Sequence, residues 1–119
     1  WNVNGFRAVL RKNAFEWIPD VDPDVLCFQE IKATLDQISA EEAIIEPYEG
    51  IWNPAERKGY SGTATYYKNK PLSHEKGFGI EHFDIEGRVI RLKYPDFYLY
   101  NIYLYINILK GYKLLLLSS

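Results

Sequence analysis

Methionine is absent from this sequence of 119 residues, which also contains only one cysteine and two histidines. The single cysteine, Cys27, cannot form a disulfide within the chain, and this usage is typical of proteins from a reducing compartment. We therefore expect a cytoplasmic protein. His74 and His82 have no partners at metal-ligand spacing, so we expect both to be surface or capping residues.

Long apolar runs are also absent. The run Leu114–Leu117 is far shorter than the roughly 20 apolar residues that a membrane-spanning helix needs, so we expect no membrane partner. The chain opens on Trp1-Asn2-Val3 with no methionine before it, and these residues resemble the middle of a strand. We expect a fragment of a longer protein, although a trimmed chain would look the same.

An excess of positive charge is the third feature that the sequence lacks. Fourteen basic and sixteen acidic residues give a net charge of −2, which does not by itself indicate a nucleic-acid-binding protein. Net charge describes the whole surface, however, and a basic face can lie within a slightly acidic protein. The composition is 47% apolar and 16% aromatic, which predicts one sheet-rich domain with enough apolar residues for a core.

The most informative stretch is the apolar run Val25–Phe28, which is followed by Gln29, Glu30 and Lys32. A continuous apolar run predicts a strand buried on both faces, because a half-exposed strand would alternate. A carboxylate at the end of such a strand is held by rigid backbone and is a suitable metal ligand. It is also an ordinary place for a strand to reach the surface, so Glu30 alone does not decide between these interpretations.

The remaining patterns predict an α/β chain. A roughly helical period covers residues 6–17, where Asn13 could divide it into two helices, and Ile18-Pro19 ends it. Ser39 and Glu42 have the spacing of a capping box, which predicts a short helix. Strands are expected at residues 48–53, 61–67, 74–77, 88–93 and 97–104, the first two forming a hairpin. The character of the sequence changes after Leu104, so we expect residues 1–104 to be part of one domain and residues 105–119 to be a divergent tail.

Asn2 and Glu30 are the candidate metal ligands. In an extended segment the side chains of Asn2 and Asn4 share one face, while Val3 points to the other. Asn2 and Glu30 both carry side-chain oxygen, and both lie at the ends of strands that we expect to be neighbours. Such ligands suit a hard cation such as Mg²⁺, which keeps several waters and takes only one or two carboxylates.

Four short motifs carry a family resemblance. They are Trp1–Ala8 (WNVNGFRA), Pro23–Lys32 (PDVLCFQEIK), Gly59–Gly62 (GYSG) and Glu86–Ile90 (EGRVI). In this order and approximate spacing they resemble exonuclease III-type apurinic/apyrimidinic (AP) endonucleases of the endonuclease/exonuclease/phosphatase superfamily. The resemblance runs from the first residue to around Leu104. Each motif alone is weakly specific, whereas four in series are specific.

The resemblance implies a fold and a reaction. The expected fold is α/β: half of a four-layered α/β sandwich of the DNase I-like type, with mixed, mostly antiparallel sheets and flanking helices. The expected activity is that of a DNA-repair phosphodiesterase that depends on Mg²⁺ or Mn²⁺. It would hydrolyse the backbone of double-stranded DNA 5′ to abasic sites or act at 3′ ends.

The resemblance also assigns roles to particular residues. Asn2 and Glu30 would bind or orient the catalytic metal. The residues expected to contact the DNA backbone are Arg7, Lys12, Gly59 and Tyr60. Two plainer interpretations stay open, because Arg7, Arg11 and Lys12 could form a solvated helix face and Tyr60 could simply pack.

The sequence departs from the family after Leu104, where a loop containing Pro-Asn would be expected. The resemblance then implies that the active-site tyrosine and the later Asp, Asn and His residues are missing, so no catalytic residue is identifiable. We expect an isolated chain to be inactive and to fold poorly, because the second sheet of the sandwich would be absent. The alternatives are a catalytically dead fragment that binds DNA or a partner, and another phosphoesterase of the superfamily acting on a phospholipid or inositol phosphate.

Overall fold

The computed structural model describes residues 1–104, so the predicted tail at residues 105–119 lies outside the described residues. The helices are α1 (Phe6–Arg11), α2 (Ile18–Val21) and α3 (Glu81–Asp84). The strands are β1 (Val25–Gln29), β2 (Glu49–Asn53), β3 (Thr63–Tyr67), β4 (Ser73–Lys76), β5 (Val89–Lys93) and β6 (Tyr98–Ile102). Within residues 1–104, none of the helices has the length and apolar character that crossing a membrane requires.

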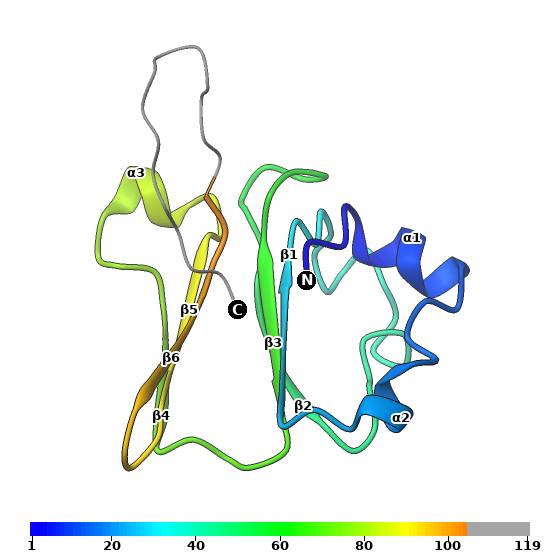
Figure 1. The fold of residues 1–119 in the computed structure, drawn as a ribbon. Helices are drawn as coiled ribbons and strands as arrows, with labels where there is room; N and C mark the ends of the chain where they lie inside the picture. Colours follow the sequence, from blue (N-terminus) through cyan, green and yellow to red (C-terminus); the bar gives the residue numbers. More distant parts are fainter. Residues whose placement is uncertain (105–119) are drawn as a thin grey trace, which may run out of the picture.

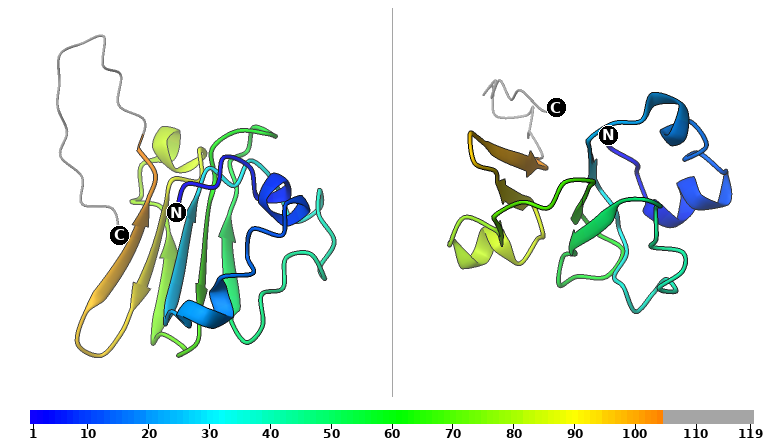
Figure 2. Two further views of the ribbon diagram at one scale, coloured as in Figure 1. Left: turned by 45° about the vertical axis from the view of Figure 1, so that its right-hand side comes forward. Right: turned by 90° about the horizontal axis from the view of Figure 1, so that it is seen from below.

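The strands form two three-stranded antiparallel sheets, one in the order β1-β3-β2 and the other in the order β4-β5-β6. The sheets face one another, and α1 and α2 lie on the outer side of the first sheet (Figure 1, Figure 2). An isolated parallel bridge between Asn2 and Gln29 makes the first sheet mixed. This arrangement is the α/β half sandwich that the sequence predicts.

The expectation that the second sheet would be absent is wrong. Strands β4, β5 and β6 build part of it, and it covers the inner face of the first sheet. Ile51 and Tyr67 of the first sheet pack with Ile90 and Leu92 of β5 in one buried cluster. Because side chains alternate along β5, both of these apolar residues point toward the first sheet. The chain therefore supplies both sides of a small core between the sheets.

Two local predictions differ from the structure. Ile18 begins α2 instead of ending a helix, because proline is tolerated in the first turn, where no intrahelical partner exists for its missing N–H. The capping box does form: Ser39 N donates to Glu42 Oε1 (3.3 Å), and Glu42 N donates to Ser39 Oγ (3.1 Å). The residues that follow form turns and no helix.

The larger core lies between the first sheet and the helices α1 and α2. Phe6 of α1 is fully buried there, with its ring centroid 4.9 Å from that of Trp52 and 5.8 Å from that of Phe28. Burying an aromatic side chain of this size contributes about 2–3 kcal/mol. Since α1 has only six residues and no side-chain N-cap, this packing is what holds it as a helix.

Both faces of β1 are covered, but unequally. Leu26 and Phe28 are buried in the larger core, whereas Val25 and Cys27 are half-buried on the opposite face. The prediction of a strand buried on both faces is therefore met fully on one side and partly on the other. Burial raises the pKa of the Cys27 thiol, which agrees with an inert core residue.

A buried amide joins the two sheets. Asn101 of β6 is 2% exposed, and its Nδ2 donates to the backbone oxygens of Phe28 (3.2 Å) and Ala64 (3.0 Å). The same nitrogen donates to Thr65 Oγ1 (3.1 Å), and Oδ1 accepts a hydrogen bond from Gln29 Nε2 at 2.7 Å. One side chain of the second sheet is thus bonded to two strands of the first, which fixes the relative position of the sheets.

Asn101→Ala should lower the free energy of unfolding by about 2–3 kcal/mol, because buried polar groups on β1 and β3 would lose their partner without gaining water. Tyr100→Ala is the matched control on the same strand, since Tyr100 is 43% exposed. In Tyr100→Ala the free energy of unfolding should fall by less than about 1 kcal/mol. Urea denaturation measures both variants, and equal losses would contradict the role of the amide between the sheets.

Stability should also fall at alkaline pH. Burial raises the pKa of Tyr66 from its ordinary value of 10.0 to about 12, and its hydroxyl donates to Ala43 O at 2.5 Å. A pKa raised in the folded state means that the stabilisation is complete below pH 10 and is lost as the pH rises toward 12. The pKa values of Tyr67 and Tyr103 are raised in the same direction, so the free energy of unfolding should decrease across this window.

Tyr66→Phe keeps the ring and removes the ionisable group. The variant should therefore show a shallower loss of stability between pH 10 and pH 12 than the unsubstituted chain. Denaturation experiments at both ends of this window measure the two slopes. An identical slope would show that Tyr66 does not contribute to the alkaline sensitivity.

Candidate functional site

The structure brings Asn2 and Glu30 to the same end of the first sheet. Asn2 forms a parallel bridge with Gln29, the residue directly before Glu30. Val3 N donates to Gln29 O at 3.0 Å, and Gly5 N donates to Glu30 O at 2.8 Å. Asn2 is exposed and Glu30 is half-buried, so both predicted ligands lie at the rim of the sheet and neither is enclosed in the apolar core.

Two loops with unusual backbone conformations meet at this rim. Glu30 (φ 54°), Lys32 (φ 51°) and Ser61 (φ 48°) lie in the left-handed region, which residues other than glycine rarely adopt. Backbone hydrogen bonds join the loops, from Ile31 N to Gly62 O (3.2 Å) and from Lys32 N to Ser61 O (2.9 Å). Such conformations cost of order 1–3 kcal/mol each and occur where the surrounding structure imposes them, often at functional sites.

The opening segment is tied to the end of β1 by its two asparagines. Asn2 Oδ1 accepts a hydrogen bond from Asn4 N at 3.0 Å, which forms a local turn. Asn4 Oδ1 accepts a hydrogen bond from Lys32 Nζ at 2.5 Å. Lys32 lies two residues after Glu30, so these contacts tie the opening segment to the chain that follows β1.

Tyr103 is a site residue that the sequence analysis missed. It follows β6, and its hydroxyl donates to Glu30 Oε1 at 2.7 Å. Burial, together with this hydrogen bond to a carboxylate, raises the pKa of Tyr103 to about 12, so the hydroxyl is protonated at neutral pH. The sequence analysis assigned no role to Tyr103. The available signal was its spacing from Asn101, because residues two apart in a strand share a face.

The available oxygen donors fit part of a magnesium coordination shell. Glu30 offers a carboxylate and Asn2 an amide oxygen, and Mg²⁺ commonly combines one or two carboxylates with several waters. Within residues 1–104, no group of three His, Cys, Asp or Glu residues could hold a metal ion. A cation bound here would therefore depend on water or on additional ligands for most of its coordination.

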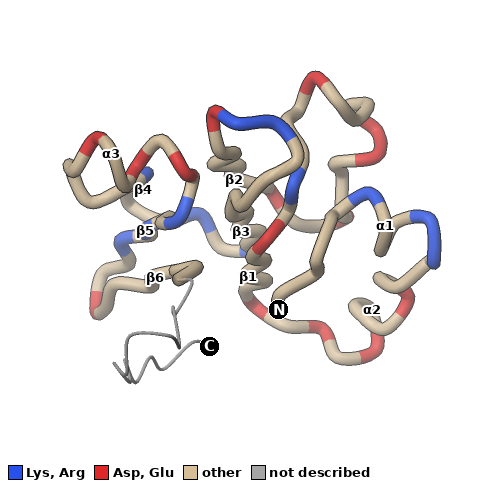
Figure 3. The backbone as a smooth tube through the Cα atoms, turned by 90° about the horizontal axis from the view of Figure 1, so that it is seen from above, with Lys and Arg blue, Asp and Glu red and all other residues tan. Residues whose placement is uncertain are grey.

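A pocket with basic residues lies beside these ligands. Its volume is about 310 Å³, and it is lined by Gly5, Arg7, Ala8, Arg11, Ile31, Lys32 and Gly59. Two of the predicted DNA contacts, Arg7 and Gly59, meet across it. Figure 3 views this end of the molecule and shows basic segments in α1 and in the loop between β2 and β3. This end is therefore locally basic, although the chain carries a net charge of −2.

The other two predicted DNA contacts are placed differently. Lys12 is exposed at the C-terminal cap of α1 and does not line the pocket. Tyr60 is half-buried, and its hydroxyl accepts a hydrogen bond from Arg88 Nη2 at 3.2 Å, so it packs toward the interior. Arg11 and Lys32 line the pocket in their place. Both were visible in the sequence as positive charges, because Arg11 follows the first motif by three residues and Lys32 is the last residue of the second.

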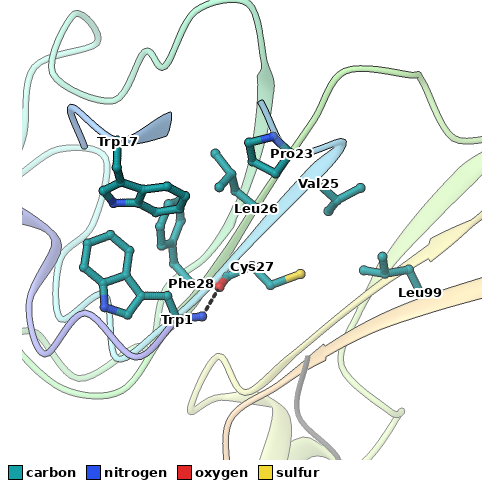
Figure 4. Close-up of a pocket in the computed structure, with 8 residues that line it drawn as sticks. All are labelled: Trp1, Trp17, Pro23, Val25, Leu26, Cys27, Phe28 and Leu99. Carbon is teal, nitrogen blue, oxygen red and sulfur yellow. Dashed lines mark hydrogen bonds between the residues drawn. The ribbon is translucent and has the colours of Figure 1, made fainter. Parts of the chain in front are cut away.

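A second cavity is apolar and belongs to a different part of the surface. Its volume is about 290 Å³, and it is lined by Trp1, Trp17, Pro23, Val25, Leu26, Cys27, Phe28 and Leu99 (Figure 4). The hydrogen bond drawn there runs from the amino group of Trp1 to Cys27 O at 2.6 Å. Among the described residues, no acidic or basic side chain lines this cavity, so the candidate site remains the polar rim around Glu30.

Comparison with known proteins agrees with this geometry. The sequence model of the Endonuclease/Exonuclease/phosphatase family matches residues 1–115. Exodeoxyribonuclease from Bacillus subtilis is 42% identical over 104 residues, which cover 87% of this chain and 40% of that protein. DNA repair nuclease APEX1 from Danio rerio is 42% identical over 105 residues, which cover 87% of this chain and 34% of that protein. The chain therefore belongs to the endonuclease/exonuclease/phosphatase family, and it spans less than half the length of these relatives.

Solved structures share the fold. The AP endonuclease from Leishmania major matches with a TM-score of 0.69 and 32% identity, covering 93% of this chain and 41% of that one. The catalytic domain of Xenopus laevis APE2 matches with a TM-score of 0.70 and 29% identity, covering 87% of this chain and 43% of that one. These matches confirm both the predicted DNase I-like half sandwich and the resemblance to AP endonucleases.

Gly62→Ala should destabilise the chain more than Gly59→Ala. At Gly62 (φ +89°) a Cβ would lie 2.7 Å from Cγ1 of Ile31, which is 1% exposed. At Gly59 (φ +73°) an added Cβ would meet nothing within 4 Å. Gly59→Ala therefore carries only backbone strain of about 1–2 kcal/mol, and Gly62→Ala adds overpacking of about 1–3 kcal/mol. Urea denaturation measures the difference; losses of the same size would contradict the tight contact with Ile31.

Proposed function

We propose that this chain supplies the cation-binding and phosphate-contacting part of a Mg²⁺-dependent phosphodiesterase that acts on double-stranded DNA at abasic sites or 3′ ends. The observation that carries the proposal is the pairing of Asn2 with Gln29, which sets Asn2 and Glu30 on one rim beside a basic pocket. Relatives named exodeoxyribonuclease and DNA repair nuclease support DNA as the substrate. A DNA substrate also supports the expectation of an intracellular, cytoplasmic protein.

Asn2 and Glu30 would hold the metal through their side-chain oxygens. When bound, Mg²⁺ or Mn²⁺ would stabilise the negative charge that builds on the phosphoryl oxygens during hydrolysis by several kcal/mol. Tyr103 holds one oxygen of the Glu30 carboxylate through its hydrogen bond, which restricts the orientation of the ligand. The left-handed backbone at Glu30 adds to this restriction.

The basic end of the molecule would attract DNA phosphates. Contacts of this kind position the duplex without reading its sequence, and they weaken as the salt concentration rises. Gly59 leaves space for close approach, because nothing lies within 4 Å of a Cβ at this position. The residues that we propose to contact the DNA backbone are Arg7, Lys12, Gly59 and Tyr60, with Arg11 and Lys32 added by the pocket.

A second candidate function is DNA binding without hydrolysis. It is favoured by the small number of ligands, since residues 1–104 hold no cluster of three metal-binding side chains. The chain also covers only 40% of the Bacillus subtilis relative, so hydrolysis could require groups from the rest of such a protein. We expect the 119-residue chain alone to bind DNA and to cut it slowly or not at all.

The metal site can be tested on the 119-residue chain by following Mn²⁺ binding with electron paramagnetic resonance. Glu30→Gln should weaken binding by at least about tenfold, because it removes the charged ligand. Glu75→Gln is the control, since Glu75 is an exposed carboxylate in the second sheet that pairs with Arg91 at 2.9 Å. Unchanged affinity in Glu30→Gln would remove the proposed metal site.

A duplex with one abasic site separates the two candidate functions. A nick 5′ to the site in Mg²⁺, and none in EDTA, would support the nuclease. Salt-dependent binding without a nick would support the binding function. Failure to bind DNA at low salt would contradict both, and hydrolysis of a phospholipid or inositol phosphate in its place would indicate another phosphoesterase of the family.

A further inference from the structure

The Glu86-Gly87-Arg88 motif has no role in the site as described so far. Arg88 is 7% exposed, and arginine is almost never fully buried unless its charge is paired. Its Nε donates to Glu86 Oε2 at 2.5 Å in an ion pair. This pair compensates the buried charge but uses only one edge of the guanidinium group.

The rest of the guanidinium group contacts two tyrosines. Nη1 donates to Tyr103 O at 3.2 Å, and the guanidinium carbon lies 5.2 Å from the centre of the Tyr103 ring. Nη2 donates to the Tyr60 hydroxyl at 3.2 Å. Arg88 therefore joins the loop that carries Gly59 and Tyr60 to the tyrosine whose hydroxyl is bonded to Glu30.

The turn that carries Arg88 is fixed against the first sheet. Thr63 Oγ1 donates to Gly87 O at 3.0 Å, and Asn53 Nδ2 donates to Val89 O at 2.9 Å. A Cβ at Gly87 would lie 2.2 Å from Asn53 O, so only glycine allows the turn to approach this closely. Arg88 thus extends from rigid backbone, and each of its side-chain nitrogens has a partner.

We propose that Arg88 is a positioning residue of the candidate site: it fixes Tyr103, and through the Tyr103 hydroxyl the Glu30 carboxylate, relative to the Tyr60 loop. The inference deepens the proposed phosphodiesterase function and rests on it. Neutralising a buried charge would need only Glu86, whereas bonding to both tyrosines requires a planar group with several donors. Lysine could not replace it, because an ammonium is a point charge without a flat face or a fork of donors.

The test uses NMR of the 119-residue chain with ¹³C-labelled tyrosine, in the absence of metal and DNA. Nuclear Overhauser contacts should connect the Tyr103 ring with the Glu30 side chain in the unsubstituted chain. Arg88→Gln and Arg88→Lys should both lose these contacts and keep those between Phe6 and Trp52 in the larger core. Arg88→Ala should lose the contacts as well. Millimolar methylguanidinium should restore them in this variant, because it supplies the planar guanidinium group without the rest of the arginine side chain.

Arg91→Gln is the matched control. Arg91 lies on β5, three residues after Arg88, pairs with Glu75 at 2.9 Å and lies 5.0 Å from the ring centre of Tyr98. Its substitution removes an ion pair and a contact with an aromatic ring, as Arg88→Gln does, but should leave the contacts of Tyr103 unchanged. Loss of those contacts in Arg91→Gln would show that they respond to general destabilisation, and the proposal would be overturned.

Retention of the Tyr103–Glu30 contacts in folded Arg88→Gln would also overturn the proposal. If Arg88→Gln does not fold, Tyr60→Phe tests the proposal instead. This variant removes one acceptor of Arg88 and leaves the ion pair with Glu86. It should shift the Tyr103 ring signals, and unchanged signals would contradict the link between the two tyrosines.

Adding Mn²⁺ to the unsubstituted chain separates this inference from the proposed function. Paramagnetic broadening of the Tyr103 signals would place the cation near Glu30. Its absence would count against the proposed function alone, because the contacts that test Arg88 are measured without metal.

Discussion

The buried amide of Asn101 is the interaction on which the candidate site depends. Apolar contacts between the sheets, such as those of Ile90 and Leu92, hold the sheets together but would tolerate sliding. Hydrogen bonds in a dry interface are directional, so the bonds of Asn101 to β1 and β3 fix one position. Tyr103 follows two residues later on the same face, and this fixed position is what brings its hydroxyl to Glu30.

Polar contacts between the sheets are concentrated toward the end that carries the site. Thr63 and Asn53 bond to the backbone at Gly87 and Val89 there, while the middle of the interface is apolar. A partial sandwich can in this way hold a defined rim without the full set of strands. The left-handed residues at that rim are maintained because the backbone hydrogen bonds around them leave no alternative conformation.

The distribution of charge matters more here than its sum. The net charge is −2, yet Arg7, Arg11 and Lys32 line one pocket at the rim. Since charges on a protein surface are screened over about 8–10 Å at physiological salt, a phosphate near this pocket responds to these residues and not to acidic residues elsewhere. The carboxylate of Glu30 beside the pocket supplies the local negative charge that a cation would need.

The sequence by itself determined the strands, the family and the neighbourhood of Asn2 and Glu30, because alternation, apolar runs and short motifs are local properties of the chain. It did not determine that residues 73–102 begin a second sheet, since alternation does not say which sheet a strand joins. Its prediction of a short helix after Ser39 was wrong, because the capping hydrogen bonds form but turns follow. Only the tertiary structure brought the Tyr103 hydroxyl to the Glu30 carboxylate. These residues are 73 positions apart and meet through strand register and the packing of two sheets. The link from Arg88 to Tyr60 and Tyr103 arose in the same way, from a buried side chain whose partners come from separate segments.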